Sequence, residues 1–135
     1  MVEKGQCLCG KIKVTVKDGS LPLQTMVCHC YSCRTTAGSA YSMVSMINLD
    51  DLEISGTPSC YGDSATGSGA TIQRHFCGNC GSPIHSQSPN VPGKTFLKLG
   101  VFAGKKKLGA PVAEVYWKNH EDWEKQLCEN VKQEM

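Results

Sequence analysis

The chain has no long hydrophobic run: its apolar stretches extend over a few residues, whereas a membrane-spanning helix needs about 20. It also has no large excess of charge, since 14 Lys and Arg against 12 Asp and Glu leave a formal net charge of +2. The one basic run, residues 105–107, lies between glycines, as a solvated turn would. We therefore expect neither a membrane protein nor a nucleic-acid-binding protein.

The amino-terminal residues lack the apolar segment of a secretory signal, so we expect a cytoplasmic protein rather than a secreted one. Apolar residues make up 40% and charged residues 19% of the chain, as in an ordinary globular domain. The sequence contains no internal repeat and no linker-like stretch, and its 135 residues suit one domain. We predict a single domain over residues 1–135, with a core at about 5–117 and a helical extension at 118–135.

Cysteine is the residue type in excess: the chain has nine. An oxidised protein usually has an even number, and nothing in the sequence indicates secretion, so disulfide bonds do not explain them. Seven fall into three tight clusters, at positions 7 and 9, at 28, 30 and 33, and at 77 and 80. We assign no chemistry to Cys60 and Cys128, which have no such neighbours. The clustered spacing predicts metal binding, and zinc is the ion that four thiolates hold in a tetrahedron.

Cys77 and Cys80 enclose Gly-Asn and precede Gly81, which is typical of a zinc knuckle, because glycine and asparagine tolerate positive φ angles. A knuckle supplies two ligands, so a closed site needs two more. Cys7 and Cys9 can supply them, which gives a structural zinc site that ties the start of the chain to its middle. In the alternative partition the knuckle binds with cysteines of the 28–33 cluster, and the spacing alone leaves that partition open.

In the favoured partition Cys28, Cys30 and Cys33 form a separate set of three ligands. Catalytic zinc sites have three protein ligands and a fourth position for water or substrate, whereas structural sites are closed. The sequence therefore predicts a catalytic zinc at these three cysteines. A redox dithiol at the knuckle is a competing interpretation, but thioredoxin-like motifs lie in an α/β pattern, and here the motif lies between two strand-like runs.

Alternation of apolar and polar residues predicts a mainly β protein. A short helical turn is expected at residues 32–36, ended by Gly38. From residue 120 onward, an apolar stripe of Trp123, Leu127 and Val131 predicts a short carboxy-terminal helix that docks on a sheet. The predicted strands are residues 11–17, 24–27, 40–46, 52–54, 71–76, 83–87, 95–102 and 113–117.

Three motifs carry a resemblance to a known family: Gly-Gln-Cys-Leu-Cys-Gly at 5–10, Cys-His-Cys-Tyr-Ser-Cys-Arg at 28–34 and His-Phe-Cys-Gly-Asn-Cys-Gly-Ser-Pro at 75–83. Together with the later segments 97–100 and 111–116, they cover residues 5 to about 117. In this order the motifs resemble those of the glutathione-dependent formaldehyde-activating enzymes, a family that includes the centromere protein V type of domain.

The resemblance implies an Mss4-like fold of small antiparallel sheets around zinc knuckles, with two zinc ions per chain. It implies that the catalytic ion is held by Cys28, Cys30 and Cys33, and that the structural ion is held by Cys7, Cys9, Cys77 and Cys80. It further implies a carbon–sulfur lyase, whose named reaction joins glutathione and formaldehyde as S-hydroxymethylglutathione or reverses that step. Residues 101–109 and those after Trp117 depart from many relatives, so the actual thiol and electrophile stay open.

A zinc ion with three sulfur ligands is suited to bind one more thiolate, because soft ligands prefer each other. We expect a thiol to lose its proton there and the thiolate to attack a small aldehyde. Arg34 directly follows Cys33 and is a catalytic candidate that would attract a substrate carboxylate or steady the thiolate charge. A surface ion pair is the competing role for Arg34. His29 is expected to face solvent, and it is a candidate for proton transfer rather than a ligand.

Other functions stay open. The same site would serve another thiol adduct if its pocket walls differ. A zinc-stabilised binding module would use both ions for folding alone and would contact a protein partner. A redox enzyme would need an accessible cysteine outside the zinc sites, for which Cys60 and Cys128 are available. The sequence does not predict an oligomeric state, and what fills the fourth position at Cys28, Cys30 and Cys33 discriminates among these functions.

Overall fold

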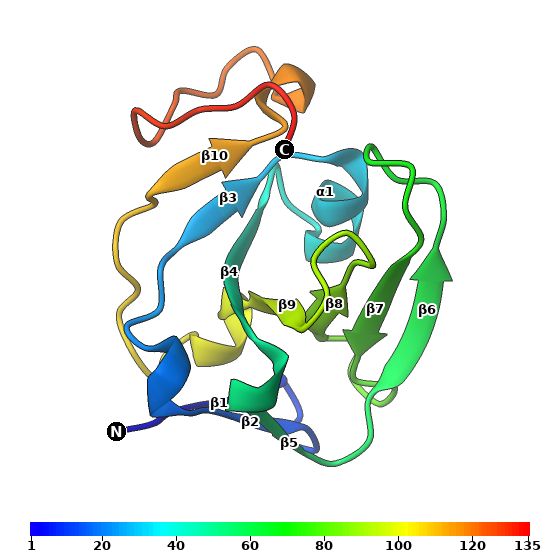
Figure 1. The fold of residues 1–135 in the computed structure, drawn as a ribbon, viewed down its shortest axis with the longest axis vertical. Coiled ribbons are helices and arrows are strands. Elements are labelled where there is room, and N and C mark those ends of the chain that lie inside the picture. Colours follow the sequence, from blue (N-terminus) through cyan, green and yellow to red (C-terminus); the bar gives the residue numbers. More distant parts are fainter.

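The computed structural model describes all 135 residues, and its strands form two sheets (Figure 1). The predicted mainly β fold is confirmed. The single α-helix is α1 (Tyr31–Ala37), and the four 3-10 helices are η1 (Asp18–Ser20), η2 (Leu49–Asp51), η3 (Leu99–Phe102) and η4 (Trp117–Asn119). The strands are β1 (Glu3–Gln6), β2 (Lys13–Val16), β3 (Met26–Cys28), β4 (Ser42–Asn48), β5 (Leu52–Ser55), β6 (Ser59–Asp63), β7 (Ile72–Phe76), β8 (Pro83–Gln87), β9 (Lys94–Lys98) and β10 (Ala113–Val115).

The small sheet has the order β1-β2-β5, and the large sheet has the order β10-β3-β4-β9-β8-β7-β6. All pairs are antiparallel except β10 with β3. One hydrophobic cluster joins the two sheets, since Val14 and Val16 of β2 pack with Ile47, Ile84 and Leu97 of the large sheet. Because side chains alternate along a strand, Phe96 and Lys98, which flank Leu97, face the other side of the large sheet. That second face carries the candidate site.

Helix α1 follows β3 directly and begins at Cys30, whose sulfur accepts a hydrogen bond from the N–H of Cys33. It ends at Gly38, which has a φ of 60° in the left-handed region that terminates many helices. The helical turn predicted at 32–36, with its stop at Gly38, is therefore confirmed. No helix in the structure has the length and apolar character that crossing a membrane requires.

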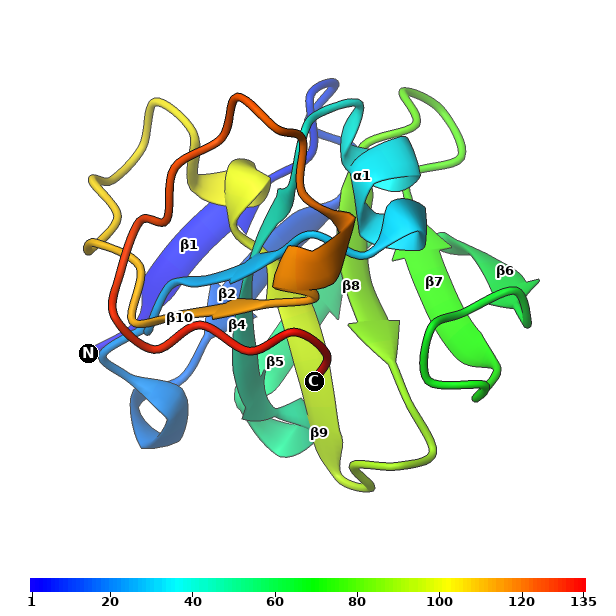
Figure 2. The same cartoon turned by 90° about the horizontal axis from the view of Figure 1, so that it is seen from above.

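The predicted carboxy-terminal helix is wrong. After η4 the chain forms no α-helix and instead runs along β10, as Figure 2 shows in orange and red. Its backbone bonds to that strand: the N–H of Glu114 donates to Asn130 O, and the N–H of Lys132 donates to Glu114 O, both at 2.9 Å. The residues of the expected apolar stripe do not dock as a helix face, since Trp123 is 73% exposed and Leu127 is 48% exposed, while Val131 pairs with Glu114 as extended backbone. Three apolar residues bury too little area to outweigh the hydrogen bonds that the free edge of β10 offers.

Most strand predictions match the structure within two residues, with three differences. Strands β1 and β6 were not predicted, because neither shows the expected alternation: β1 reads EKGQ, and β6 is exposed at four of its five positions. The predicted strand 95–102 stops at Lys98 and continues as η3, which turns Leu99, Val101 and Phe102 into the core.

Candidate metal centres and substrate cavity

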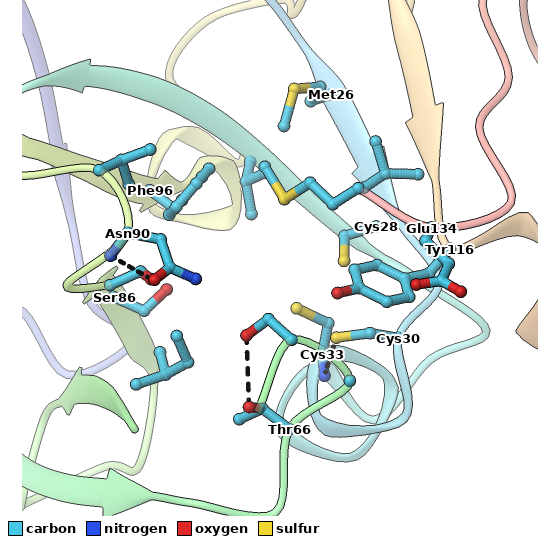
Figure 3. Close-up of a pocket in the computed structure, with 18 of the residues that line it drawn as sticks. Met26, Cys28, Cys30, Cys33, Thr66, Ser86, Asn90, Phe96, Tyr116 and Glu134 are labelled. Atoms are coloured by element: carbon cyan, nitrogen blue, oxygen red, sulfur yellow. Dashed lines mark hydrogen bonds between the residues drawn. The ribbon is translucent and has the colours of Figure 1, made fainter. Parts of the chain in front are cut away.

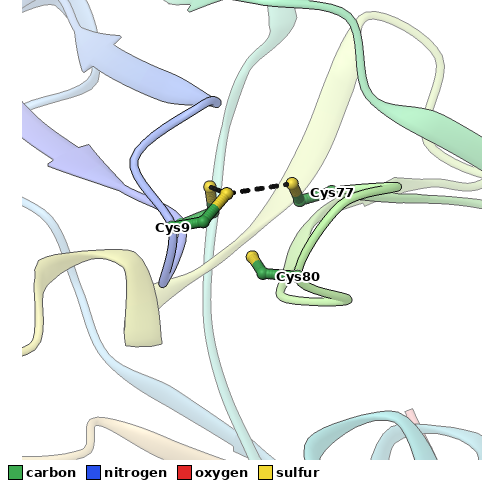
Figure 4. Close-up of side chains that lie close together, drawn as sticks. Cys9, Cys77 and Cys80 are labelled. Atoms are coloured by element: carbon green, nitrogen blue, oxygen red, sulfur yellow. Dashed lines mark hydrogen bonds between the residues drawn. The ribbon is translucent and has the colours of Figure 1, made fainter.

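Four cysteines from two distant turns meet in one cluster (Figure 4). Cys7 and Cys9 follow β1, whereas Cys77 and Cys80 lie in the turn between β7 and β8. Their four Sγ atoms all lie within 4.8 Å of one another. The cluster therefore connects the small sheet to the large one, and it contains none of the cysteines 28, 30 and 33.

The sulfur–sulfur distances in this cluster fit a metal ion and not a disulfide. Cys9 Sγ lies 3.7 Å from Cys7 Sγ and 3.8 Å from Cys77 Sγ. A disulfide bond is about 2.05 Å long. A tetrahedral ion with metal–sulfur bonds of about 2.3 Å holds its thiolates about 3.8 Å apart. The four side chains thus have the spacing of a closed tetrahedral site.

Hydrogen-bond donors surround these sulfurs. The N–H of Ile12 donates to Cys7 Sγ at 3.2 Å, and the Ser82 hydroxyl lies 3.2 Å from Cys80 Sγ. Hydrogen bonds from the side chain and backbone of Ser82 lower the pKa of Cys80 to about 5. Gly81, with a φ of 79°, provides the left-handed turn that the knuckle needs. Because a metal ligand must be deprotonated, these contacts favour the thiolate form that binds an ion.

The second cluster joins the end of a strand to the start of a helix. Cys28 is the last residue of β3, Cys30 caps α1 and Cys33 lies in the first turn of that helix. Their Sγ atoms lie within 4.8 Å of one another, and no fourth Cys, His, Asp or Glu ligand belongs to the group. Donor chemistry and spacing therefore fit an ion with three protein ligands. We call Cys28, Cys30 and Cys33 the three-sulfur cluster.

Positive charge lies beside the three-sulfur cluster. Lys98 of β9 is buried, its Nζ is 3.9 Å from Cys33 Sγ, and it takes part in no ion pair. Hydrogen bonds from Cys28 and Cys30, and then the charges of Lys98 and Arg74, hold the pKa of Cys33 well below its usual value. Hydrogen bonding to Cys30 and Cys33, together with burial, raises the pKa of Cys28. The positive charge of Lys98 thus lies where it favours the thiolate form of Cys33.

A cavity of about 390 Å³ extends from the three-sulfur cluster across the large sheet (Figure 3). The register explains its walls: Val44 pairs with both Met26 and Lys98, and Ser86 pairs with both Phe96 and Arg74. Paired residues share a face, so six strands contribute side chains to one hollow. Loops 66–68 and 88–91 and the terminal residues 134–135 complete the rim.

Tyr116 lies at the inner end of the cavity, next to the sulfurs. It is buried, and it packs with Cys28, Cys33 and Val115. In Figure 3 its hydroxyl points into the space that the sulfurs of Cys28 and Cys30 also face. Burial and then the nearby thiols raise the pKa of this phenol, which keeps it protonated. The cavity thus contains a neutral hydroxyl donor beside its sulfur ligands.

Arg34, the catalytic candidate from the sequence, does not line the cavity. Its Nη1 donates to the carbonyl of Asn119 at 2.8 Å, and its Nη2 is paired with Glu121. Both partners belong to the chain after β10. The competing role, an ion pair at the surface, describes the observed contact of Arg34, which fastens the carboxy-terminal segment to α1.

The expectation that His29 faces solvent is wrong. The residue is 1% exposed. Its neighbours Cys28 and Cys30 face the cavity, and because side chains alternate around β3, His29 points to the opposite, buried side. Its Nε2 lies 2.9 Å from Glu114 Oε1, and its Nδ1 lies 3.4 Å from Glu124 Oε1. Its ring also meets Tyr41 and Trp117 edge-on. His29 therefore anchors the metal-binding loop from behind.

Sequence reasoning missed Lys98 and Tyr116. A signal for Lys98 was present, since a lysine between Leu97 and Leu99 in an apolar strand is unusual and buried lysines need a partner. No local signal identified Tyr116, because its place depends on the parallel pairing of β10 with β3. The candidate redox cysteines also lie elsewhere: Cys60 is exposed on β6, and neither it nor Cys128 lines the cavity.

Comparison with known proteins places the chain in a family. A Talaromyces marneffei protein that bears the name of the family is 34% identical over 89 residues, which are 62% of this chain and 46% of that protein. The match thus spans less than half of the relative's length. A crystal structure of a Rhodobacter sphaeroides protein has the same fold, with a TM-score of 0.60 and 23% identity over 77% of this chain and 91% of that one. Residues 2–119 match the family profile, so the chain belongs to the glutathione-dependent formaldehyde-activating enzyme family.

Proposed function

We propose that this protein is a zinc-dependent carbon–sulfur lyase that forms or cleaves the adduct of a thiol, such as glutathione, with formaldehyde or another small electrophile. The observation that carries the proposal is the contrast between the two cysteine clusters. Four sulfurs surround one position completely, whereas the three-sulfur cluster has no fourth protein ligand and faces a cavity. Closed zinc sites are structural and open ones are catalytic.

The proposed roles follow from that contrast. Cys28, Cys30 and Cys33 hold the catalytic ion, while Cys7, Cys9, Cys77 and Cys80 hold the structural one. When bound, the ion at the three-sulfur cluster supplies Lewis acidity and an affinity for one further soft sulfur ligand. Lys98 donates to Cys33 and offsets the negative charge that accumulates when several thiolates share one site.

The cavity suits a small peptide-like thiol. Its volume of about 390 Å³ lies in the range of small-molecule sites. Met26, Val44 and Phe96 give it an apolar floor, and the lining also includes serine and threonine hydroxyls of the loops. Lys98, which takes part in no ion pair, and Arg74, which is paired with Asp63 at 2.8 Å, place positive groups in the lining that can attract the carboxylates of a thiol such as glutathione.

The family and its setting support this proposal. The matched relative is named for glutathione-dependent formaldehyde activation. The proposed cellular site is the cytoplasm, where thiols are kept reduced and the seven clustered cysteines stay free for metal. We also propose that residues 1–135 act as one domain, since the carboxy-terminal segment is hydrogen-bonded to β10.

The proposal is tested with purified, zinc-replete protein. The expected result is two zinc ions per chain and accelerated adduct formation when glutathione is mixed with formaldehyde or another small aldehyde. Cys30→Ser should abolish this activity, and Cys60→Ser, a matched control on an exposed strand, should not. Two bound zinc ions without activity on any thiol and aldehyde pair would refute the enzyme and favour a binding module.

A further inference from the structure

We propose that the Tyr116 hydroxyl is a catalytic group that donates a hydrogen bond to the aldehyde oxygen while the carbon–sulfur bond forms. This inference rests on the proposed function and deepens it, because it assigns the part of the site that acts on the electrophile. Its basis is the position of Tyr116, the conformation of its backbone and the packing of its ring.

The backbone of Tyr116 is held in a conformation that a tyrosine seldom adopts. Its φ is 56° and its ψ is 37°, and it is the only non-glycine residue of the chain with a positive φ. An aromatic residue adopts this left-handed region at a cost, and such residues concentrate at functional sites. Hydrogen bonds from the Tyr116 N–H to Glu134 O and from the Asn119 N–H to Tyr116 O hold the turn. An ordinary extended backbone would continue β10 and aim the ring elsewhere.

The ring itself is fixed from two sides. Gly67, in the loop between β6 and β7, lies so close that a Cβ there would be 2.7 Å from Tyr116 Cε1 and 3.3 Å from its hydroxyl oxygen. On the other side the ring packs on the three-sulfur cluster. Tyr116 is 7% exposed, so its hydroxyl meets the contents of the cavity rather than bulk solvent. The phenol is therefore oriented before any ligand enters.

The reaction requires a hydrogen-bond donor for the aldehyde oxygen, and the Tyr116 hydroxyl lies where it can provide one. As the thiolate attacks, the sulfur electron pair forms the C–S bond and the π pair of the C=O bond moves to oxygen. The proton that the thiol released ends on that oxygen, so atoms and charge balance without an oxidant or reductant. A preorganised hydroxyl next to the sulfurs is placed to stabilise the oxygen during this step and to hold it again when the adduct is cleaved. Lys98 is less suited, because its ammonium already contacts Cys33.

The test compares Tyr116→Phe with Tyr61→Phe, a matched change at a tyrosine that is 64% exposed on β6 and does not line the cavity. Three quantities are measured on zinc-loaded protein: kcat and KM with glutathione and formaldehyde, zinc per chain, and the Kd of glutathione by calorimetry. We expect Tyr116→Phe to lower kcat about 100-fold, the loss typical of one oxyanion donor. Zinc content and the Kd of glutathione should stay at the wild-type values, and Tyr61→Phe should match the wild type throughout.

Gly67→Ala provides an independent variant, because the added methyl group displaces the ring and leaves the hydroxyl in the protein. It should also lower kcat with zinc content retained. Wild-type kcat in Tyr116→Phe would overturn the inference and leave the proposed function standing. Loss of zinc or of glutathione binding in Tyr116→Phe would overturn it as well, since the residue would then be a ligand or a binding contact. A wild-type protein without activity would refute the proposed function and the inference with it.

Discussion

Glu114 is expected to be among the carboxylates that stabilise this fold most. It is 0% exposed, and its side chain accepts hydrogen bonds from Leu127 N–H at 2.6 Å and pairs with His29 at 2.9 Å. Glu114→Ala would leave His29 and the Leu127 N–H without this partner inside the protein. Breaking a buried pair by removing one member costs about 3–5 kcal/mol. For a chain of this length, that loss lowers the melting temperature by about 10–20 °C.

The measurement is urea unfolding and thermal melting of zinc-loaded protein. Glu114→Gln keeps the shape and one acceptor oxygen, so it should lose less than the alanine variant. Glu121→Gln is the control, because Glu121 belongs to the same carboxy-terminal segment but its pair with Arg34 is partly exposed. Such pairs contribute about 0–1 kcal/mol. If Glu114→Ala were no less stable than Glu121→Gln, the reasoning about buried pairing at His29 would be wrong.

Further predictions concern the cysteines and one histidine. Cys77→Ser should melt far below the wild type and Cys30→Ser close to it, because a structural ion contributes directly to folding; equal losses would contradict separate roles. A strong chelator should remove the ion of the three-sulfur cluster first, because three protein ligands hold an ion less tightly than four. In that case activity is lost before the circular dichroism signal of the folded protein. Burial, and then His75 and Lys98, lower the pKa of His85 to about 4 from 6.5. The contribution of neutral His85 to stability should therefore be fully present above pH 6.5 and be lost as the pH falls toward 4, by about 1–2 kcal/mol between pH 7 and 5; His85→Gln should show a shallower slope in urea melts.

The strands of the large sheet could be predicted because burial of one face requires apolar residues at alternate positions of the sequence. In β9, for example, Thr95 and Leu97 are fully buried, whereas Phe96 between them lines the cavity on the other face. The carboxy-terminal segment could not be predicted in this way. Its spacing of four suits a helix, but the free edge of β10 exists only after β3 and β10 have paired. A local pattern cannot show that a distant strand will offer hydrogen bonds.

The same limit applies to the candidate site. Cysteine spacing was sufficient to find the local clusters, because a metal ion demands a particular residue type in tight turns. It left open which cluster joins Cys77 and Cys80, and the fold brings Cys7 and Cys9 to them. Arg34 was chosen for its nearness to Cys33 in sequence, but the helix directs it to Asn119 and Glu121 of the carboxy-terminal segment and not into the cavity. Lys98 of β9 lies 65 residues beyond that cysteine and Tyr116, which directly follows β10, lies 83 residues beyond it, so only the fold brings them to it.

Polar contacts and aromatic packing of His29 together hold the loop that carries the three-sulfur cluster. Cys28 and Cys30 face the cavity, and His29 between them reaches back to Glu114 and Glu124. Glu124 lies beyond residue 119, where the family match ends, and so do the residues 134–135 that close one side of the cavity. The segment after residue 119 therefore contacts the loop of the three-sulfur cluster through Glu124 and lines the cavity through residues 134–135. Cys28, Cys30 and Cys33 lie within the matched residues 2–119, whereas this segment lies outside them and lines the cavity, so we expect differences in substrate between this protein and its relatives to originate there.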